Sequence, residues 1–462
     1  MTPFLKMEAT MNGKKLHKKI TSSIQLSQSS KYTYMLGILA IGLVPIAYFG
    51  VPHFLSPYSY EATVGSALGA TTTPEAAEAV ESVPHLATPD PLAAVYMSQC
   101  VVGTPSFRDS LVALIEETEL NAVVIDIKDY SGTIGIPTTD PRFESASLVS
   151  CGAYDIADFI ARLHEKNIYV IGRITVFQDP HYAQLNPQEA VQSVSRPGEP
   201  WKDNKGLAFV DVSSRLFWDY IVTLSKEAYA LGFDELNYDY IRYPSDGPMK
   251  DAQYINNSKA DALEAFFKYL AEKMRPTGAV LSADLFGYTT VLTDDLGIGQ
   301  QLERALPYFD YIAPMVYPSH YNSGFAGLAN PNSDPYKVAY TSMAGAVKRT
   351  EARETTVKTL DGVPIYRDET VPAHTTEAGE FIATSTRKVA TGLYTKEKYN
   401  RLKLRPWLQD FDYGGNYGKA EVRAQIQATY DAGLTSWMLW DPANRYTPEA
   451  LRKASTTPAV EQ

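Results

Sequence analysis

Polar and bulky apolar side chains alternate along residues 232–244, GFDELNYDYIRYP. The polar set is Glu235, Asn237 and Asp239, and the bulky set that alternates with it is Leu236, Tyr238 and Tyr240. Because successive strand side chains point to opposite faces, this pattern predicts a strand with one polar face. A segment of helical period, 217–230, precedes it directly, which favours a parallel strand covered by helices. In a closed barrel the polar face points inward, where carboxylates are costly unless they are paired or used in chemistry.

The same rhythm of short apolar runs and helical segments extends over residues 93–462. Strands are predicted at 93–96, 122–127, 168–176, 232–244, 279–286, 311–316, 405–409 and 435–440. Helices are predicted at 107–118, 156–166, 217–230, 259–274, 299–306, 336–347 and 419–432, and from Thr447 onward with Pro448 at the first position. This strict alternation predicts a parallel α/β sheet, and eight units predict a closed (β/α)8 TIM barrel.

An open, doubly wound sheet is the alternative to the barrel. Such a sheet normally has a glycine-rich phosphate turn after its first strand, and residues 97–103, MSQCVVG, are not of that kind. The polar segment 351–403 interrupts the rhythm and has little helical period. It predicts an insertion in the barrel, for which a hairpin near the rim is one interpretation.

An uncharged apolar run of eighteen residues, 34–51, precedes the barrel. It is long enough to cross a bilayer as a helix, and lysines cluster before it rather than after it. This pattern predicts a basic cytoplasmic segment (1–33), a single transmembrane anchor (34–55), a flexible linker (56–92) and a barrel outside the cytoplasm. A cleaved signal peptide is the alternative, although the nearest small-residue site, 66–70, lies far from the apolar run.

Net charge narrows the classes of partner. The formal net charge of the chain at pH 7 is −11. Residues 1–55 contain six Lys and one Glu and have a net charge of +5, so the rest of the chain has a net charge of about −16. A domain this acidic is a poor candidate for binding nucleic acid through phosphate contacts. The two cysteines, Cys100 and Cys151, would be able to pair in an exported domain, and the sequence leaves open whether they do.

Three carboxylates lie where predicted strands end, which is where barrel enzymes hold their active sites. They are Asp126, Asp239 and Asp284. Glycoside hydrolysis needs two carboxyl groups across a sugar ring, one to protonate the leaving oxygen and one to attack or to activate water. Asp239 and Asp284 end adjacent strands, which lie roughly 5 Å apart in a sheet. That spacing suits a retaining enzyme, and Asp126 is the third candidate.

Other strand-end residues are predicted to complete the site. Alternation places Lys128 on the same face as Asp126, and Lys128, Arg173 and Glu235 are expected to hold the site as charge partners more than to react. The residues expected to bind substrate or to line its site are Lys128, Arg173, Glu235, Arg242, Tyr317, His320, Gln409 and Trp440.

Aromatic residues offer stacking surfaces for sugar rings. Tyr317, Trp407 and Trp440 are the candidates, with an ordinary core position as the alternative for each. His320 is expected to contact substrate rather than a metal, because no HxH or HExxH spacing accompanies it. No metal or organic cofactor is expected.

Five motifs together carry a family resemblance: NAVVIDIKD, YVIGRITVFQDP, GFDELNYDYIRYP, APMVYPSHY and RPWLQDF. From about residue 94 to 446 the chain resembles a glycoside-hydrolase-like (β/α)8 domain family of bacteria, a domain family of unknown function in the glycosidase superfamily. The resemblance implies a barrel, often exported, with glycan substrates. It points to Asp126 and Lys128 in IDIKD, Asp239 in DYIRYP, and Tyr317 and His320 in YPSHY, and the insertion looks longer than the family pattern.

A fainter likeness to chitinases lies in the fourth predicted strand, where those enzymes read DGxDxDxE. Asp234 and Asp239 fall in register, but Asn237 replaces one acid and Ile241 stands at the position of the catalytic Glu. The comparison therefore disfavours substrate-assisted catalysis of the chitinase type.

These observations predict a membrane-anchored, outward-facing glycosidase that acts on a cell-surface or extracellular polysaccharide. Asp239 is the expected nucleophile or base, and Asp284 or Asp126 the expected acid. The alternatives are a non-catalytic glycan-binding or wall-associated barrel, a metal-assisted hydrolase, and a purely structural role in which Asp239 is buried and paired.

Overall fold

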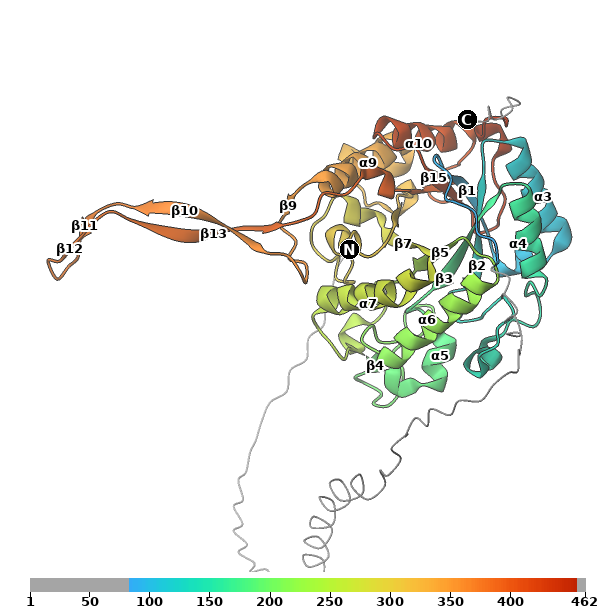
Figure 1. Ribbon diagram of the computed structural model, residues 1–462, viewed down its shortest axis with the longest axis horizontal. Coiled ribbons are helices and arrows are strands. Elements are labelled where there is room, and N and C mark those ends of the chain that lie inside the picture. The colour runs from blue at the N-terminus through green and yellow to red at the C-terminus, as the bar shows by residue number, and fades with distance from the viewer. Residues whose placement is uncertain (1–82, 455–462) are drawn as a thin grey trace, which may run out of the picture. The chain divides into compact units, whose positions relative to one another are not determined.

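A computed structural model describes residues 83–454, in which eight parallel strands close into a barrel (Figure 1). In order around the barrel the strands are β1 (Ala93–Met97), β2 (Ala122–Lys128), β3 (Tyr169–Thr175), β5 (Glu235–Asp239), β7 (Val280–Phe286), β8 (Tyr311–Met315), β14 (Trp407–Gln409) and β15 (Trp437–Trp440). β15 pairs with β1 and completes the ring. The prediction of a closed (β/α)8 barrel is confirmed, and the open sheet is excluded.

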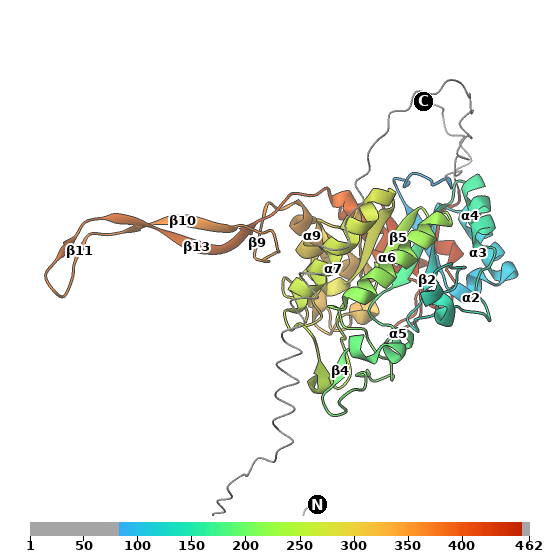
Figure 2. The same cartoon turned by 60° about the horizontal axis from the view of Figure 1, so that its bottom comes forward.

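A helix follows each of the first seven barrel strands. These helices are α3 (Pro105–Glu117), α4 (Ile156–Glu165), α6 (Arg215–Ala230), α7 (Lys259–Met274), α8 (Leu302–Ala305), α9 (Pro335–Glu351) and α10 (Lys419–Asp431). Figure 2 shows α6 and α7 side by side over the strands. The short helices α2 (Gln99–Val102) and α5 (Pro180–Leu185) were not predicted.

The prediction of a helix that begins at Thr447 is wrong. The chain forms only a 3₁₀ turn, Pro448–Ala450, and then runs along the end of α3. There the backbone amide of Glu119 donates to the carbonyl of Arg452, and the backbone amide of Ala454 donates to the carbonyl of Glu117. These bonds engage the backbone groups that a continued helix would have used internally.

Two apolar layers follow from the alternation of strand side chains. Every second residue points into the barrel, and the others face the helices. The interior layer consists of Leu92, Ala94, Tyr96, Ala122, Val124, Tyr169, Ile171, Ala313, Tyr317, Trp407 and Met438. The outward faces and the helices form one larger core around it. The interior is therefore filled with side chains.

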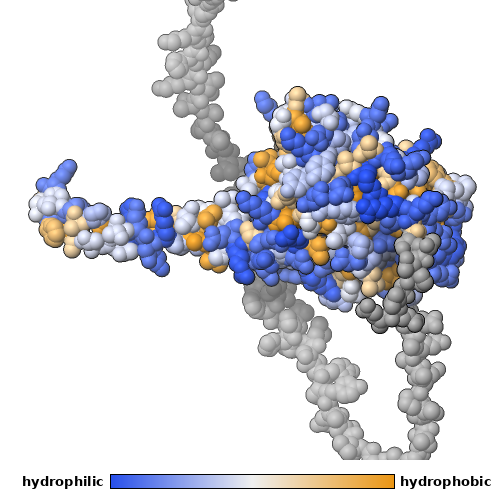
Figure 3. All heavy atoms as spheres, turned by 90° about the horizontal axis from the view of Figure 1, so that it is seen from above, coloured by the Kyte–Doolittle hydropathy of each residue, from blue (hydrophilic) through white to orange (hydrophobic). Residues whose placement is uncertain are grey.

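A long hairpin occupies most of the segment between α9 and β14. β10 (Pro364–Val371) pairs antiparallel with β13 (Ser385–Thr395), which also pairs with the short β9 (Glu354–Thr355). The hairpin extends away from the barrel (Figure 1), and most of its side chains are exposed. Figure 3 shows apolar and polar side chains mixed along its surface.

Cys100 and Cys151 form a disulfide, which resolves the question that the sequence left open. It joins α2 to the loop before α4 across a sequence separation of 51 residues. A cross-link that closes a loop of this length restricts the unfolded chain and is typically worth about 2–4 kcal/mol.

The predicted cytoplasmic segment and membrane anchor, 1–33 and 34–55, lie outside the described residues, as does most of the linker. Residues 83–92 of the predicted linker instead pack against the barrel. The amide of Leu86 donates to Asp234 Oδ1 at 2.6 Å, and Thr88 Oγ1 lies 2.9 Å from the hydroxyl of Tyr169. Within 83–454, no helix has both the length and the apolar character needed to span a bilayer.

Candidate active site

Arg173, on β3, lies among three carboxylates from neighbouring strands. Its Nη1 donates to Asp126 Oδ1 on β2 at 2.6 Å. Nε donates to Asp239 Oδ2, at the end of β5, at 3.2 Å, and Nη2 donates to the same oxygen. Asp284 Oδ2, on β7, lies 3.9 Å from that Nε. All four side chains are buried, so one cation faces three carboxyl groups in a medium that screens charge poorly.

Asp284 is held so that one of its oxygens accepts two hydrogen bonds. Asn237 Nδ2 and Trp407 Nε1 donate to Oδ1 at 2.9 and 2.8 Å. Burial, reinforced by the negative charge of Asp239, raises the pKa of Asp284 well above its usual value, although Arg173 opposes the shift. Because Oδ1 accepts two N–H donors, Oδ2 is the oxygen that is available to carry a proton.

Asp239 is held as an acceptor on both oxygens. Arg173 donates to Oδ2, and the backbone amide of Tyr240 donates to Oδ1 at 2.6 Å. Both oxygens of Asp239 therefore serve as acceptors of N–H donors. Tyr240 has a φ of 50°, a left-handed conformation that is uncommon for a residue with a large side chain. Backbone strain of this kind is concentrated at functional sites.

Asp126 forms a separate, fully engaged group behind Arg173. The Tyr96 hydroxyl donates to its Oδ2 at 2.5 Å, and Arg173 binds its Oδ1. Burial raises the pKa of Asp126, with Arg173 and Tyr96 acting in the opposite direction. Tyr96 is itself anchored through its backbone, whose carbonyl accepts a 2.6 Å bond from the Tyr446 hydroxyl. Asp126 thus orients Arg173 and does not face the open part of the site.

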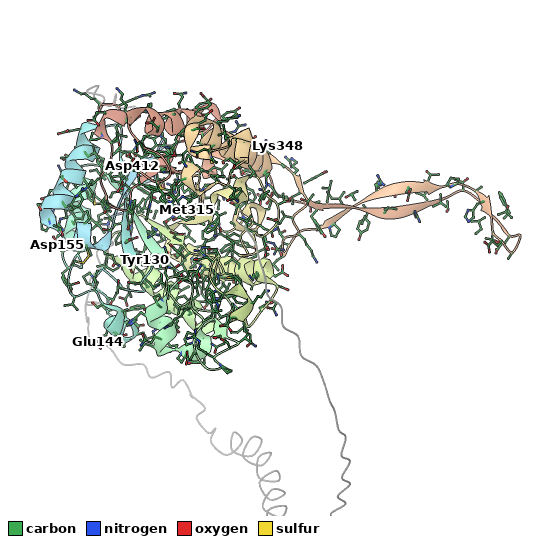
Figure 4. All side chains as sticks on the ribbon, turned by 180° about the vertical axis from the view of Figure 1, so that it is seen from behind. Tyr130, Glu144, Asp155, Met315, Lys348 and Asp412 are labelled. Atoms are coloured by element: carbon green, nitrogen blue, oxygen red, sulfur yellow. A yellow bond between two sulfur atoms is a disulfide. The ribbon has the colours of Figure 1, made fainter. Side chains whose placement is uncertain are left out.

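A cavity of about 340 Å³ opens over Asp239 and Asp284. The residues that line it are Arg173, Asp239, Tyr240, Arg242, Asp284, Phe286, Gly287, Tyr288, Met315, Tyr317, His320, Tyr321, Trp407 and Trp440. Figure 4 shows Met315 among the side chains near the middle of the barrel. Trp440 stacks on Tyr96 with ring centroids 4.1 Å apart. Aromatic walls around a few convergent polar groups are typical of small-molecule sites.

The structure brings most of the predicted site residues to this cavity. Arg173, Asp239, Arg242, Asp284, Tyr317, His320, Trp407 and Trp440 line it. Asp126, Lys128, Glu235 and Gln409 do not.

The prediction that Lys128 shares a face with Asp126 is wrong. Two residues of β2 oppose one of β3 between Asp126 and Lys128, as in a β-bulge, and this breaks the alternation. Lys128 therefore leaves the interior and forms a buried ion pair with Asp179, Nζ to Oδ2 2.8 Å. Its Nζ also donates to the Thr175 carbonyl at 2.8 Å. Lys128 ties the strand ends together outside the cavity.

Glu235 and Gln409 also have structural partners. Glu235, the first residue of β5, accepts a 2.5 Å bond from Arg405 at the opposite end of the barrel interior from the cavity. Gln409 Oε1 accepts from the amide of Ser319 at 3.2 Å and from its hydroxyl at 2.8 Å. Gln409 thereby positions the loop after β8, which carries His320 into the cavity lining.

Several residues of the site escaped the sequence reasoning. Tyr96 binds Asp126, and Tyr240, Phe286 and Tyr288 line the cavity. Trp407 is a predicted stacking residue, but its hydrogen bond to Asp284 is not predicted. Asn237 was placed on the same strand face as Asp239, which was the signal for its role. For Tyr96 the only available signal was its position at the end of the first predicted strand.

Asp410, directly after β14, offers a stability prediction that does not depend on activity. Burial raises its pKa from 3.8 to about 6 in the folded protein, so its ionisation opposes folding as pH rises from 3.8 to 6. Asp410→Asn is expected to raise the free energy of unfolding at pH 7 by up to about 3 kcal/mol. Urea unfolding at pH 4 and pH 7 measures the effect, and an equal gain at both values would contradict this origin.

The substitution keeps the local hydrogen bonds. Asp410 Oδ2 accepts from the amide of Thr447 at 3.0 Å, and Oδ1 from its hydroxyl at 2.7 Å. An Asn side chain retains the first bond through its oxygen, and its amide donates to the hydroxyl in the second. Asp158→Asn, on the exposed face of α4, is the control in which no change is expected.

Comparison with solved structures finds chains that are similar to parts of this one. A hypothetical protein of Ruminiclostridium thermocellum shares 33% identity over 44% of this chain and 98% of that chain, with a TM-score of 0.38. The glycoside hydrolase domain of PgaB (BpsB) from Bordetella bronchiseptica is 13% identical over 79% of this chain and 100% of that chain, with a TM-score of 0.47. The spore cortex-lytic enzyme SleL of Bacillus megaterium is 9% identical over 78% of this chain and 72% of that chain, with a TM-score of 0.41.

No curated protein sequence matches the chain. A family model does, over residues 94–360 and 366–446, which is most of the described barrel. That match agrees with the five motifs, and with the closed barrel and the carboxylates at its strand ends. The chain belongs to the family described as "Putative glycosyl hydrolase domain".

Proposed function

We propose that this barrel is a glycosidase in which Asp284 is the general acid and Asp239 is the nucleophile or base. The observation that carries the proposal is the contrast between the two carboxyl groups around Arg173. Asp284 is favoured in its neutral form by burial and by the charge of Asp239, whereas Asp239 accepts N–H donors on both oxygens. Two carboxyl groups in opposed environments on one cavity wall are what glycoside hydrolysis requires.

The chemistry follows from these positions. Asp284 Oδ2 gives its proton to the glycosidic oxygen as the bond to the leaving sugar breaks, and Asp239 attacks the anomeric carbon or deprotonates a water that does so. Arg173 holds Asp239 in place and stabilises its charge. Asp239 Oδ2 and Asp284 Oδ2 lie 3.2 and 3.9 Å from the same nitrogen. These distances keep the two oxygens within about 7 Å of each other, a range that includes the carboxyl spacing of retaining enzymes. Proton NMR of the anomer that is released first tests whether configuration is retained.

Asp284 is a better acid than Asp126 in this arrangement. Asp284 lines the cavity, whereas Asp126 does not. Both oxygens of Asp126 are also engaged by Tyr96 and Arg173. We therefore assign Asp126 a positioning role.

We also propose that the barrel is anchored in the membrane by residues 34–55 and acts on a cell-surface or extracellular polysaccharide. The apolar run 34–51 with its preceding lysines supports this orientation. The disulfide between Cys100 and Cys151 also fits an oxidising compartment outside the cytoplasm. Protease added to intact cells should remove the barrel, and full protection would overturn the orientation.

The test of the enzymatic proposal is hydrolysis of polysaccharides by the purified full-length protein, measured as new reducing ends over a panel of wall and capsule glycans. At least one glycan should be cleaved. The double variant Asp239→Asn/Asp284→Asn should lose activity by about 10⁴-fold or more, while Asp158→Asn on exposed α4 should match the parent. Glycan binding by parent and double variant alike, with no cleavage by either, would favour the non-catalytic binding protein.

A further inference from the structure

Arg242 differs from the other buried arginines of residues 83–454. Five arginines are buried there, and four form ion pairs with carboxylates: Arg108, Arg173, Arg304 and Arg405. Arg242 is only 7% exposed and has no such partner within this part of the chain. A buried cation without a counter-ion is costly. The cost points to a partner that comes from outside the protein.

The guanidinium of Arg242 is held rigidly at the cavity wall. Its centre lies 4.8 Å from the ring centroid of Tyr240 and 4.9 Å from that of Phe286. Nη1 donates to the carbonyl of Tyr243 at 3.0 Å. Gln300 Nε2 fixes the same loop through the carbonyl of Ile241 at 3.2 Å. The aromatic contacts partly offset the desolvation of the charge, but they do not neutralise it.

One edge of this guanidinium is free. Nε and Nη2 have no hydrogen-bond acceptor among the residues that the structure describes, and neither is sealed from solvent as Nε and Nη1 of Arg405 are. Burial lowers the pKa of Arg242, and charge interactions with Tyr240, and then with Asp239, Asp246 and Asp203, only partly oppose this shift. The Nε–Nη2 edge presents two parallel N–H donors, a geometry that matches a carboxylate.

Arg242 lines the cavity that holds the proposed catalytic pair. Arg242 comes three residues after Asp239, and Phe286 comes two residues after Asp284. We propose that the substrate carries a carboxylate on a sugar next to the cleaved bond, as hexuronic acids do, and that Arg242 binds it. This inference rests on the proposed glycosidase function and names its substrate class.

The test compares acidic oligosaccharides with their carboxyl-reduced forms, in which each uronic acid becomes the neutral sugar of the same linkage. Trigalacturonate and oligomers of β-linked glucuronic and mannuronic acid are the probes, offered to the full-length protein. We expect kcat/KM for at least one acidic oligomer to exceed that for its reduced form by about 100-fold. Arg242→Met should remove most of this preference, and Arg242→Lys should restore only part of it because Lys lacks the paired donors.

Arg215→Met is the matched control. Arg215 also stacks on an aromatic ring, 3.7 Å from the centroid of Trp218, but it is exposed on α6 and does not line the cavity. Its loss should leave the preference unchanged. If Arg242→Met weakens acidic and reduced substrates equally, or if the parent prefers the reduced forms, the inference is overturned. An Arg242-dependent preference for sulfate esters over carboxylates would overturn the uronic assignment.

Binding separates a failure of this inference from a failure of the proposed function. Calorimetric titration of Asp239→Asn with the same pairs measures recognition without turnover. Arg242-dependent binding of acidic oligomers without cleavage by the parent would support the inference and contradict the glycosidase. Cleavage of neutral glycans with no preference for acidic ones would support the glycosidase and contradict the inference.

Discussion

Asp284→Asn is expected to lower kcat/KM by about 10³-fold on substrates with a sugar leaving group, and by only about tenfold on aryl glycosides with an acidic phenol. A phenolate leaves without protonation, so the lost acid matters little for its departure. Asp239→Asn should lower both values by 10³-fold or more, because attack on the anomeric carbon is needed for either leaving group. Initial rates with the two substrate classes measure the contrast.

Folding controls accompany this test. Because the pKa of Asp284 is raised in the folded protein, its ionisation opposes folding once the pH exceeds its unfolded value. Asp284→Asn should therefore be at least as stable as the parent at pH 7, since Asn237 and Trp407 still find an acceptor oxygen. A variant that loses activity because it unfolds, or one that fails equally on both substrate classes, would contradict the acid assignment.

The pH profile gives an independent check on the same residue. Activity requires protonated Asp284, so kcat/KM should fall on the alkaline side as the pH rises through its elevated pKa. In Asp284→Asn the residual activity on aryl glycosides should lack this alkaline fall. Its persistence in the variant would assign the ionisation to another group.

Arg173→Met is expected to lower the free energy of unfolding at pH 7 by about 3–5 kcal/mol and to abolish activity. The substitution leaves Asp126, Asp239 and Asp284 buried without the cation that all three of them face. Because protonation relieves the repulsion, the loss should be smaller at pH 5 than at pH 7. Urea unfolding at the two pH values measures it.

Arg304→Met is the matched control for this prediction. Arg304 is also buried and pairs with Glu264 Oε2 at 2.6 Å, but it does not line the cavity. Its replacement should destabilise the protein while leaving activity per folded molecule near that of the parent. If Arg173→Met destabilises no more than Arg304→Met and retains activity, Arg173 has only a structural role.

The sequence by itself determined the barrel and the position of its chemistry. Alternation within 232–244 placed Asn237 and Asp239 on one strand face, and the eightfold β–α rhythm implied that Asp284 follows on the neighbouring strand. Both inferences depend on properties of the local backbone: side chains alternate along a strand, and parallel strands align their carboxyl ends. Neither inference depends on contacts between residues that are distant in the sequence.

Only the tertiary structure decided which of the polar side chains meet. A bulge turned Lys128 away from Asp126, and Glu235 paired with Arg405, 170 residues away. Trp407, 123 residues from Asp284, supplied one of the two donors that fix that acid. Arg242 was left without a carboxylate by the same arrangement. The register of a closed barrel sets these encounters, and it depends on all eight strands at once, whereas alternation reports only the face on which each residue lies.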